Sequence, residues 1–380
     1  MSVATLEIQT PGMHTTVQDL GRTGFQRFGV PVAGAADPTA LRVANILVGN
    51  REGAAALEVT AIGPKATFLS DTVIAITGAD LGALIDGQPV PRWRSVPVAS
   101  GSTLEFTGPS DGMRAYLALT GGIVVPVVMG SRSTYVLGGI GGLEGRPLVS
   151  GDVLKSLLIA NASGFRAEEM PEDIEPPVYG NEHELRVVLG PQKDAFTDVG
   201  VSTFLSSQYT VTADSDRMGC RLEGPVIEHV SSPDIVSDAN AFGSIQVPGI
   251  GQPIILLADR GTTGGYPKVA TVISPDVGLV AQAMVGDTVR FAAVTVAEAY
   301  EILREQEQMI AEIKRSVGVD RSGAFSIAAD GMSLPVTTET GDRVARPDSI
   351  ATPKRTDVRP VSVTMDGQDF EFEVEVRHET

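Results

Sequence analysis

The chain has 380 residues, 42% of them hydrophobic, so it is long enough to form two domains that each bury a core. Aromatic residues are scarce at 5%, while 42 glycines and 24 prolines indicate many turns, a composition typical of a mainly β protein. The net charge of −18 argues against sequence-independent binding to nucleic acid or to anionic membranes.

The sequence also indicates the cellular location of the protein. The first residues lack the basic and apolar regions of a signal peptide, and no run reaches the 18 or so apolar residues that a membrane span requires. We therefore expect a cytoplasmic protein with no membrane segment. The single cysteine, Cys220, excludes a disulfide within the chain.

The first half of the chain contains one predicted helix among short strands. Asp37 followed by Pro38 predicts the helix start, with Asp37 as the N-cap, and apolar residues at helical spacing lead to a stop at Gly49. Short β-type segments separated by turn signals cover residues 56–60, 73–77, 83–85, 103–106, 115–120 and 153–157. Together these elements predict a first β-rich module over residues 1–165.

An acidic, proline-rich stretch at residues 166–184 has the composition of a linker. A second β-rich module is predicted over residues 185–315, with strands at 185–189, 209–212, 254–257, 269–273 and 288–292. Its closing helix spans 296–314, because the apolar residues there fall on one helical face. A Gly-led turn followed by a strand recurs at 101–106, 151–154 and 286–291, which favours two related modules.

Residues 316–380 are predicted to form an extension. Residues 316–360 are poor in large apolar residues and rich in Asp, Thr, Ser and Pro, as expected of a flexible segment. Alternating apolar residues on both sides of Asp366-Gly367 predict a terminal hairpin. A two-stranded hairpin is marginal alone, so we expect it to add to the body or to a partner.

Charged residues beside glycine turns mark a first candidate substrate-binding region. Asp19 and Arg22 lie in QDLGR at residues 18–22, and Arg132 lies in GSRST at residues 130–134. A carboxylate and two guanidinium groups suit a polar substrate, although Asp19 and Arg22 equally suit a pair that fixes a loop. The glycine-rich run at 138–146 resembles an anion cradle, but it lacks the Gly-Lys-Ser/Thr of a Walker A loop.

The stretch from residue 217 to residue 268 carries the richer candidate site. Its glycine turns offer N–H groups for an anion-binding nest. An arginine guanidinium there can bind a carboxylate through two hydrogen bonds. A glutamine amide can both donate to and accept from the amide group of a substrate. The predicted substrate-binding residues here are Arg217, Arg221, Gln246, Thr262 and Thr263. The predicted catalytic residues, which would orient substrate, move a proton or stabilise an oxyanion, are Asp259, Tyr266 and Lys268.

Several other chemistries are disfavoured. The four histidines are not spaced as a metal-binding pair, so we expect no metal site. No Gly-x-Ser-x-Gly nucleophile elbow is present. Cys220 lies among apolar and glycine neighbours, a setting typical of an inert core cysteine.

Nine ordered motifs resemble the allophanate hydrolase subunit 2 family, also known as the family of the 5-oxoprolinase C subunit, which is related to the carboxyltransferase part of urea carboxylase. They are TVQDLGR (16–22), GVP (29–31), ANILVGN (44–50), LEVT (57–60), GSRST (130–134), DRMG (216–219), RLEG (221–224), IQVP (245–248) and TTGGYP (262–267). The resemblance covers about residues 5–300 and excludes the tail.

The resemblance implies two cyclophilin-like β-barrel modules and a partner, the kinase-inhibitor-like subunit 1 protein, which in 5-oxoprolinase is the B subunit. It implies a complex that uses ATP, and a cytoplasmic hydrolase of carbon–nitrogen bonds in a small amide or carboxylate substrate. The chain lacks the Met-Lys-Met biotinylation site and an identifiable ATP motif. Any biotin must therefore arrive on another protein, and nucleotide would bind at the partner or at an unusual site.

The leading hypothesis is an ATP-dependent 5-oxoprolinase subunit that opens a lactam together with the subunit 1 partner. A second hypothesis is carboxyl transfer to a urea-like amide, with carboxybiotin supplied by another protein. A third is a non-catalytic regulator that sequesters the subunit 1 partner away from a kinase.

Overall fold

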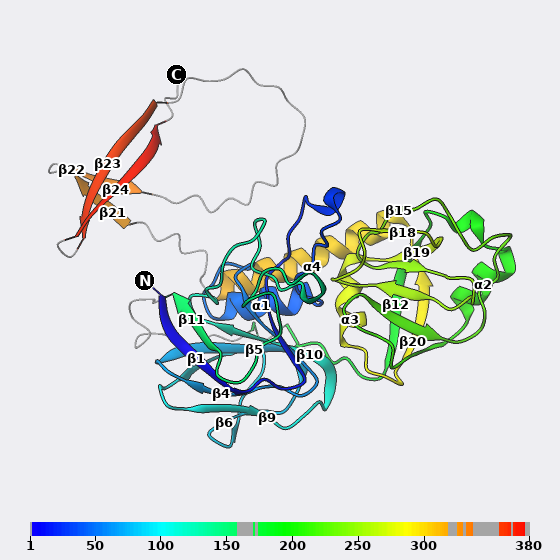
Figure 1. Cartoon of the computed structure of the whole chain (residues 1–380), viewed down its shortest axis with the longest axis horizontal. Helices are drawn as coiled ribbons and strands as arrows, with labels where there is room; N and C mark the ends of the chain where they lie inside the picture. Colours follow the sequence, from blue (N-terminus) through cyan, green and yellow to red (C-terminus); the bar gives the residue numbers. More distant parts are fainter. Residues whose placement is uncertain are drawn as a thin grey trace. The chain divides into compact units, whose positions relative to one another are not determined.

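The structure of the protein, a computed structural model, describes residues 2–157, 170–171 and 174–317, and the backbone of the strands 325–329, 332–336, 357–365 and 368–376. Residues Met1–Val319 form one compact unit and Asp320–Thr380 form a second. Within the first unit, a sheet-rich module drawn in blue and cyan lies beside a barrel drawn in green and yellow (Figure 1). The prediction of a mainly β protein is confirmed.

The first module consists of two antiparallel sheets. The six-stranded sheet has the order β11 (Val153–Leu157), β1 (Ser2–Thr10), β4 (Lys65–Phe68), β9 (Thr103–Phe106), β6 (Ala83–Ile85) and β7 (Gln88–Pro89). The five-stranded sheet has the order β2 (His14–Gln18), β3 (Ala56–Thr60), β10 (Asp111–Leu119), β5 (Thr72–Asp80) and β8 (Ser95–Val98). Leu6, Ile8 and Leu57 are among the fully buried residues of the core to which both sheets contribute.

The second module is a closed barrel. Its order is β12 (Glu182–Leu189), β19 (Lys268–Val272), β16 (Ser244–Gln246), β17 (Ile254–Leu256), β14 (Gly219–Glu223), β13 (Tyr209–Val211) and β20 (Thr288–Ala293). The barrel closes because β20 pairs in parallel with β12, so that each of these strands has a neighbour on both sides. Phe204 of α2 (Asp198–Ser206) packs on Phe291 of β20 with ring centroids 4.3 Å apart.

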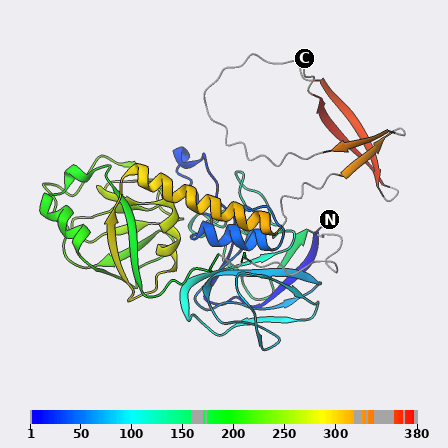
Figure 2. The same ribbon diagram turned by 180° about the vertical axis from the view of Figure 1, so that it is seen from behind.

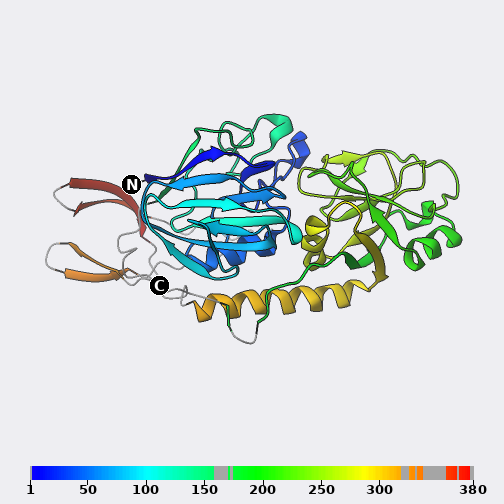
Figure 3. The same ribbon diagram turned by 90° about the horizontal axis from the view of Figure 1, so that it is seen from below.

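Two helices bind the modules together. The first, α1 (Pro38–Leu47), begins where Asp37 accepts a 3.0 Å hydrogen bond from the Ala40 N–H, as its N-cap sequence predicts. The other, α4 (Val296–Ser316), follows the barrel in sequence but lies alongside α1 of the first module (Figure 2). Viewed from below, α4 runs from the barrel to the sheets (Figure 3). Ile310 and Ile313 of α4 are buried in the same core as α1.

Most elements predicted from the sequence are present. The strands at 56–60, 83–85, 103–106 and 153–157 have the predicted bounds, and the closing helix extends two residues beyond its predicted end. The predicted linker at 166–184 lies partly outside the described residues, and β12 already begins at Glu182. Among the described residues, no helix is both long and apolar enough to cross a membrane.

The second unit contains two antiparallel strand pairs. The predicted hairpin is present as β23 (Asp357–Met365) paired with β24 (Gln368–Val376). A further pair, β21 (Phe325–Ala329) with β22 (Met332–Val336), lies within 316–360, where the sequence predicted only a flexible segment. The low density of large apolar residues over 316–360 hid these two short strands, because compositional averages are insensitive to segments of five residues.

Substitution of Ile313 by Ala tests the attachment of α4. We expect the free energy of unfolding of the first unit to fall by about 2–4 kcal/mol, because a buried isoleucine is truncated and leaves a cavity. Chemical denaturation followed by circular dichroism measures the change. The matched control is Glu312→Ala on the exposed face of the same turn, which should change stability by less than about 0.5 kcal/mol. Equal effects would show that α4 does not pack against α1.

Candidate functional site

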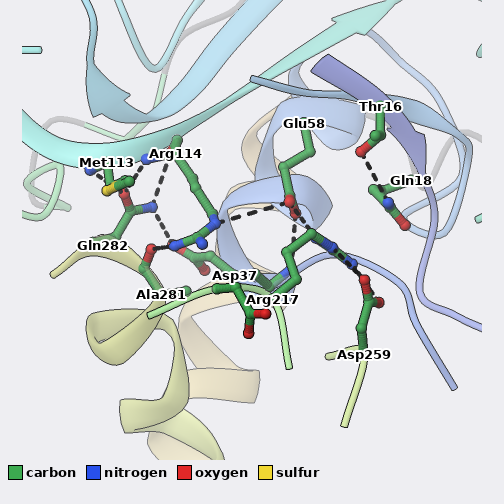
Figure 4. Close-up of polar contacts among 12 residues, drawn as sticks. Thr16, Gln18, Asp37, Glu58, Met113, Arg114, Arg217, Asp259, Ala281 and Gln282 are labelled. Carbon is green, nitrogen blue, oxygen red and sulfur yellow. Dashed lines mark hydrogen bonds and ion pairs between the residues drawn. The ribbon is translucent and has the colours of Figure 1, made fainter. Parts of the chain in front are cut away.

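Arg217 ties the two modules together through buried ion pairs. It precedes β14 of the barrel, and its guanidinium lies between Glu58 of β3 and Asp259 of the barrel (Figure 4). Its Nε and Nη2 donate to the Asp259 carboxylate at 3.0 and 3.1 Å. Its Nη1 donates to Glu58 Oε1, and Nη2 also donates to the Gly34 carbonyl at 2.6 Å. Every nitrogen of the fork therefore has a protein acceptor.

Burial sets the electrostatics of this bridge. Burial alone would raise the pKa of Glu58, but Arg217 and Arg114, with hydrogen bonds from the Ala36 N–H and the Tyr116 hydroxyl, lower it overall. Burial likewise opposes the charge of Arg217, yet its two carboxylate partners raise its pKa. Glu58 and Arg217 are therefore both charged at neutral pH.

A second polar contact between the modules surrounds Gln282, the last residue of α3 (Val277–Gln282). Its Oε1 accepts from the backbone N–H groups of Met113 and Arg114 at 3.1 and 2.9 Å, and its Nε2 donates to Asp37 at 3.0 Å. Arg114 donates to the Ala281 carbonyl in return. Burial raises the pKa of Asp37 despite its hydrogen bonds from Gln282 and Ala40. At this interface between the two modules, called the seam below, each module supplies both donors and acceptors.

A different polar cluster lies at one edge of the barrel, around Lys268. Lys268 and Gln246 are paired across β19 and β16. The Lys268 side chain is 1% exposed, and its ammonium has no hydrogen-bond partner. Its nearest acidic group is Asp238 Oδ2 at 3.5 Å.

Neighbouring amides hold this cluster in place. Gln192 accepts from the Lys268 backbone N–H at 3.1 Å and donates to Asp238 at 3.0 Å. Gln246 Nε2 donates to Asn240 Oδ1 at 3.3 Å and to the Tyr266 carbonyl at 3.4 Å. The result is a buried ammonium beside a carboxamide, both held on barrel strands. Such a pair can bind a carbonyl oxygen and an amide nitrogen of one small molecule.

The remaining barrel residues of the predicted site lie nearer the surface. Thr262 is partly exposed and Thr263 is exposed, the latter on β18 (Thr263–Gly264), which pairs with β15 (Asp238–Ala239) beside the Lys268 cluster. Tyr266 is 41% exposed. Arg221 is exposed on β14, because its neighbours Cys220 and Leu222 take the buried face of the strand.

In the first module, Asp19 organises a loop. Its carboxylate accepts from the hydroxyls of Ser131 and Ser133 at 2.6 and 2.5 Å and from the backbone N–H of Arg132 at 2.6 Å. The Arg132 side chain donates to the Val125 carbonyl at 3.1 Å. Arg22 is 1% exposed and donates to the Ser133 carbonyl. Asp19 thus fixes the 131–133 loop. Among the hydrogen bonds that the structure gives, none joins Asp19 to Arg22.

Residues that the sequence pattern joined into one site fall into different networks in the structure. Arg217 and Asp259 pair with each other within the barrel, and Arg217 also pairs with Glu58 across the seam. Glu58, Arg114 and Gln282 were not predicted from the sequence. The position of Glu58 within a strand was the feature that could have identified it. All five residues of that strand are buried, and a buried carboxylate requires a cationic partner.

Cys220 is a buried free thiol, and burial raises its pKa to about 11, which makes it a poor nucleophile. Among the side chains that the structure describes, no group of three or more His, Cys, Asp or Glu is placed to hold a metal ion. The barrel-edge cluster offers ammonium, amide and carboxylate groups.

Two β modules joined by a buried ionic seam, with a polar cluster on the barrel, define a two-part domain. Residues 28–293 match the family described as carboxyltransferase domain, subdomain A and B. The chain belongs to this family, and the resemblance read from its motifs is confirmed.

Individual relatives match most of the chain. It is 38% identical over 309 residues to the 5-oxoprolinase C subunit of Escherichia coli (strain K12), a match that covers 81% of this chain and 97% of that protein. It is 35% identical over 322 residues to urea amidolyase of Saccharomyces cerevisiae, covering 80% of this chain and 17% of that protein. The crystal structure of the K. lactis urea amidolyase matches 96% of this chain and 22% of that chain, with a TM-score of 0.77 and 29% identity.

Replacing Arg217 by Met tests the ionic seam. The substitution leaves Glu58 and Asp259 buried without their main cation, so we expect a loss of about 3–5 kcal/mol in the free energy of unfolding at pH 7. In the natural chain the lowered pKa of Glu58 stabilises the fold above the unfolded glutamate pKa of about 4.3, and this contribution fades as the pH falls through the folded value. In the variant, burial should instead raise the pKa of Glu58, so the stability deficit should shrink between pH 7 and pH 5.

Urea denaturation at the two pH values measures this effect. The control is Arg304→Met, which removes an exposed pair with Glu301 and should cost less than about 1 kcal/mol at both pH values. A deficit for Arg217→Met that is the same at pH 7 and pH 5 would contradict the assignment of Glu58 as its partner.

Proposed function

We propose that this chain belongs to a heteromeric enzyme that opens the amide bond of a small molecule, with ATP-dependent hydrolysis of the 5-oxoproline lactam as its reaction. The observation that carries the choice of reaction is the match to the E. coli 5-oxoprolinase C subunit over 97% of that protein. The urea amidolyase relative contains the equivalent of this chain as only 17% of its length. A match to a whole separate polypeptide favours the assembly in which that polypeptide works.

The Lys268 cluster is the proposed site of lactam binding. The ammonium has unused N–H groups in a buried position, so it can donate to the lactam oxygen as negative charge develops there. We propose that Gln246 Oε1 accepts from the lactam N–H, because Gln246 Nε2 already donates to Asn240 and to the Tyr266 carbonyl. In the proposed reaction water attacks the lactam carbonyl, the carbon–nitrogen bond breaks, and ATP hydrolysis drives the opening.

Other predicted residues take supporting roles in the proposal. Asp259 and Arg217 hold the modules in register, and Thr262 and Thr263 border the cluster through the β15–β18 pair. The exposed Arg221 and Tyr266 are available to a partner protein or to a substrate that enters from solvent. We propose that the kinase-inhibitor-like subunit 1 protein completes the site and that ATP is a substrate of the complex.

Carboxyl transfer to a urea-like nitrogen is a second candidate. It is favoured by the family description and by 35% identity to a urea amidolyase. In that case the carboxybiotin would be delivered by another polypeptide, and the same ammonium would stabilise charge on the transferred carboxylate. Turnover of carboxybiotin by the purified complex, without turnover of 5-oxoproline, would select it.

The decisive assay is ATP hydrolysis by this chain co-purified with its subunit 1 partner, with and without 5-oxoproline. We expect stimulation that requires 5-oxoproline and this chain. A tight complex that turns over neither 5-oxoproline nor carboxybiotin would instead indicate regulation by sequestration of the partner.

Lys268→Met separates catalysis from folding in this assay. We expect turnover to fall by at least about 100-fold, as when an oxyanion donor is removed. Thermal stability should be equal or higher, because an apolar side chain of similar size replaces a buried ammonium that lacks hydrogen bonds. The control is Lys193→Met, an exposed lysine next to Gln192, which should leave both properties unchanged. Full turnover in Lys268→Met would exclude the proposed role.

A further inference from the structure

Arg260 of the barrel is a partly buried cation whose guanidinium is bound only by backbone carbonyls. Its Nε donates to the Asn240 carbonyl and its Nη1 donates to the Leu257 carbonyl, both at 3.1 Å. Within the described part of the chain, Nη2 has no hydrogen-bond acceptor and no carboxylate forms an ion pair with Arg260. The N–H groups of Nη2 therefore remain available to a ligand.

The charge of Arg260 is not neutralised by its acidic neighbour in the sequence. The Asp259 carboxylate accepts hydrogen bonds from Arg217 at 3.0 and 3.1 Å, so it is already occupied. Burial lowers the pKa of Arg260 to about 10, and the negative charge of Asp259 offsets this effect only in part. Arg260 is still protonated at neutral pH, and a bound anion would supply the counter-ion that it lacks.

Two neighbours fix the orientation of this guanidinium. It lies over the ring of Phe242, with its central carbon 5.2 Å from the ring centroid, and Phe242 packs against the barrel core. Asn240 is attached to the 261–262 backbone, because its N–H donates to the Thr262 carbonyl and its Nδ2 donates to the Gly261 carbonyl, both at 3.0 Å. Arg260 is therefore positioned before any ligand binds, which lowers the entropic cost of binding.

Asn240 also joins Arg260 to the Lys268 cluster. Its Oδ1 accepts from Gln246 Nε2 at 3.3 Å, while its backbone carbonyl accepts from Arg260. Gln246 is in turn paired with Lys268 across β16 and β19. Lys268, Gln246 and Arg260 are thus connected in this order, with a single residue between the amide of Gln246 and the guanidinium of Arg260.

The backbone next to Arg260 is open to solvent. Gly261 is exposed, and among the described residues a Cβ added there would have one contact within 4 Å, the Thr263 carbonyl oxygen at 3.3 Å. Thr262 is partly exposed and Thr263 is exposed. A small ligand can therefore approach Arg260 along this segment.

We propose that Arg260 binds a carboxylate carried by the substrate, so that the enzyme acts on carboxylated amides in preference to neutral ones. The inference rests on the proposed function, which places the amide group at Lys268 and Gln246. In 5-oxoproline the N–H lies between the ring carbonyl and the carbon that bears the carboxylate. Its carbonyl, N–H and carboxylate therefore follow one another in the same order as Lys268, Gln246 and Arg260.

Titration calorimetry of this chain co-purified with its subunit 1 partner tests the proposal, with 5-oxoproline and 2-pyrrolidinone as probes. The second probe is the same lactam without the carboxylate. We expect 5-oxoproline to bind roughly 10–100-fold more tightly, as expected for charge-assisted hydrogen bonds. Arg260→Met should weaken 5-oxoproline by that factor and leave 2-pyrrolidinone unchanged. Arg260→Lys should bind 5-oxoproline with intermediate affinity, because an ammonium keeps the charge but loses the planar fork.

The matched control is Arg290→Met, which removes an exposed arginine of β20 bonded to Gln208 and should bind both lactams as the natural chain does. Circular dichroism of each variant verifies its fold. The proposal is overturned if Arg260→Met binds 5-oxoproline as tightly as the natural chain or weakens both lactams equally. It is also overturned if the natural complex binds the two lactams equally or binds neither. Binding of 5-oxoproline that depends on Arg260 without ATP hydrolysis would reject lactam opening and retain the carboxylate site.

Discussion

Arg217 holds a positive charge where water does not reach, and the arrangement of the first unit depends on how that charge is compensated. One carboxylate, Glu58, comes from β3 of the sheet module and the other, Asp259, from the barrel that carries Arg217, so the pair with Glu58 forms only when the modules are docked. A buried cation that lost either partner would destabilise the fold by several kcal/mol. The docking geometry is therefore specified electrostatically, while α1 and α4 supply the apolar contact that accompanies it.

The same principle distinguishes structural from functional cations in this chain. Every nitrogen of the Arg217 guanidinium has an acceptor, with acceptors on both sides of the seam. Lys268 and Arg22 are equally buried but have unused N–H groups. Burial without hydrogen bonds opposes folding, and a ligand that accepts from the Lys268 ammonium would offset this cost. The proposed lactam site follows from this contrast.

Rigid placement matters for the polar clusters of both modules. Lys268 and Gln246 are on paired barrel strands, and Gln18 ends β2 of the first module. Asp19 fixes the loop that carries Ser133, the residue that anchors Arg22. Groups held in this way keep their orientation without a bound ligand, which reduces the entropy that binding must remove.

Local sequence signals determined much of this protein. Short β-type segments between turn signals specified strands such as 56–60 and 103–106, Asp37-Pro38 specified the start of α1, and the spacing of apolar residues specified α4. The ordered motifs specified the family, because they combine turn glycines with particular polar residues over some 300 positions. These features depend on neighbours in the chain, and a sequence displays such neighbours directly.

Tertiary structure alone decided which polar residues meet. Glu58 and Arg217 are 159 residues apart in the chain, and no periodicity or motif spacing connects them. From the sequence, Arg217 was expected to bind a substrate; in the structure, docking of the modules pairs it with Glu58, and the barrel fold pairs it with Asp259. Hydrogen-bond saturation is likewise a property of the folded interior, so the unused donors of Lys268 and Arg22 became apparent only once their surroundings were known. Composition and motifs supply the inventory of functional groups, but long-range packing decides which of them remain free to bind.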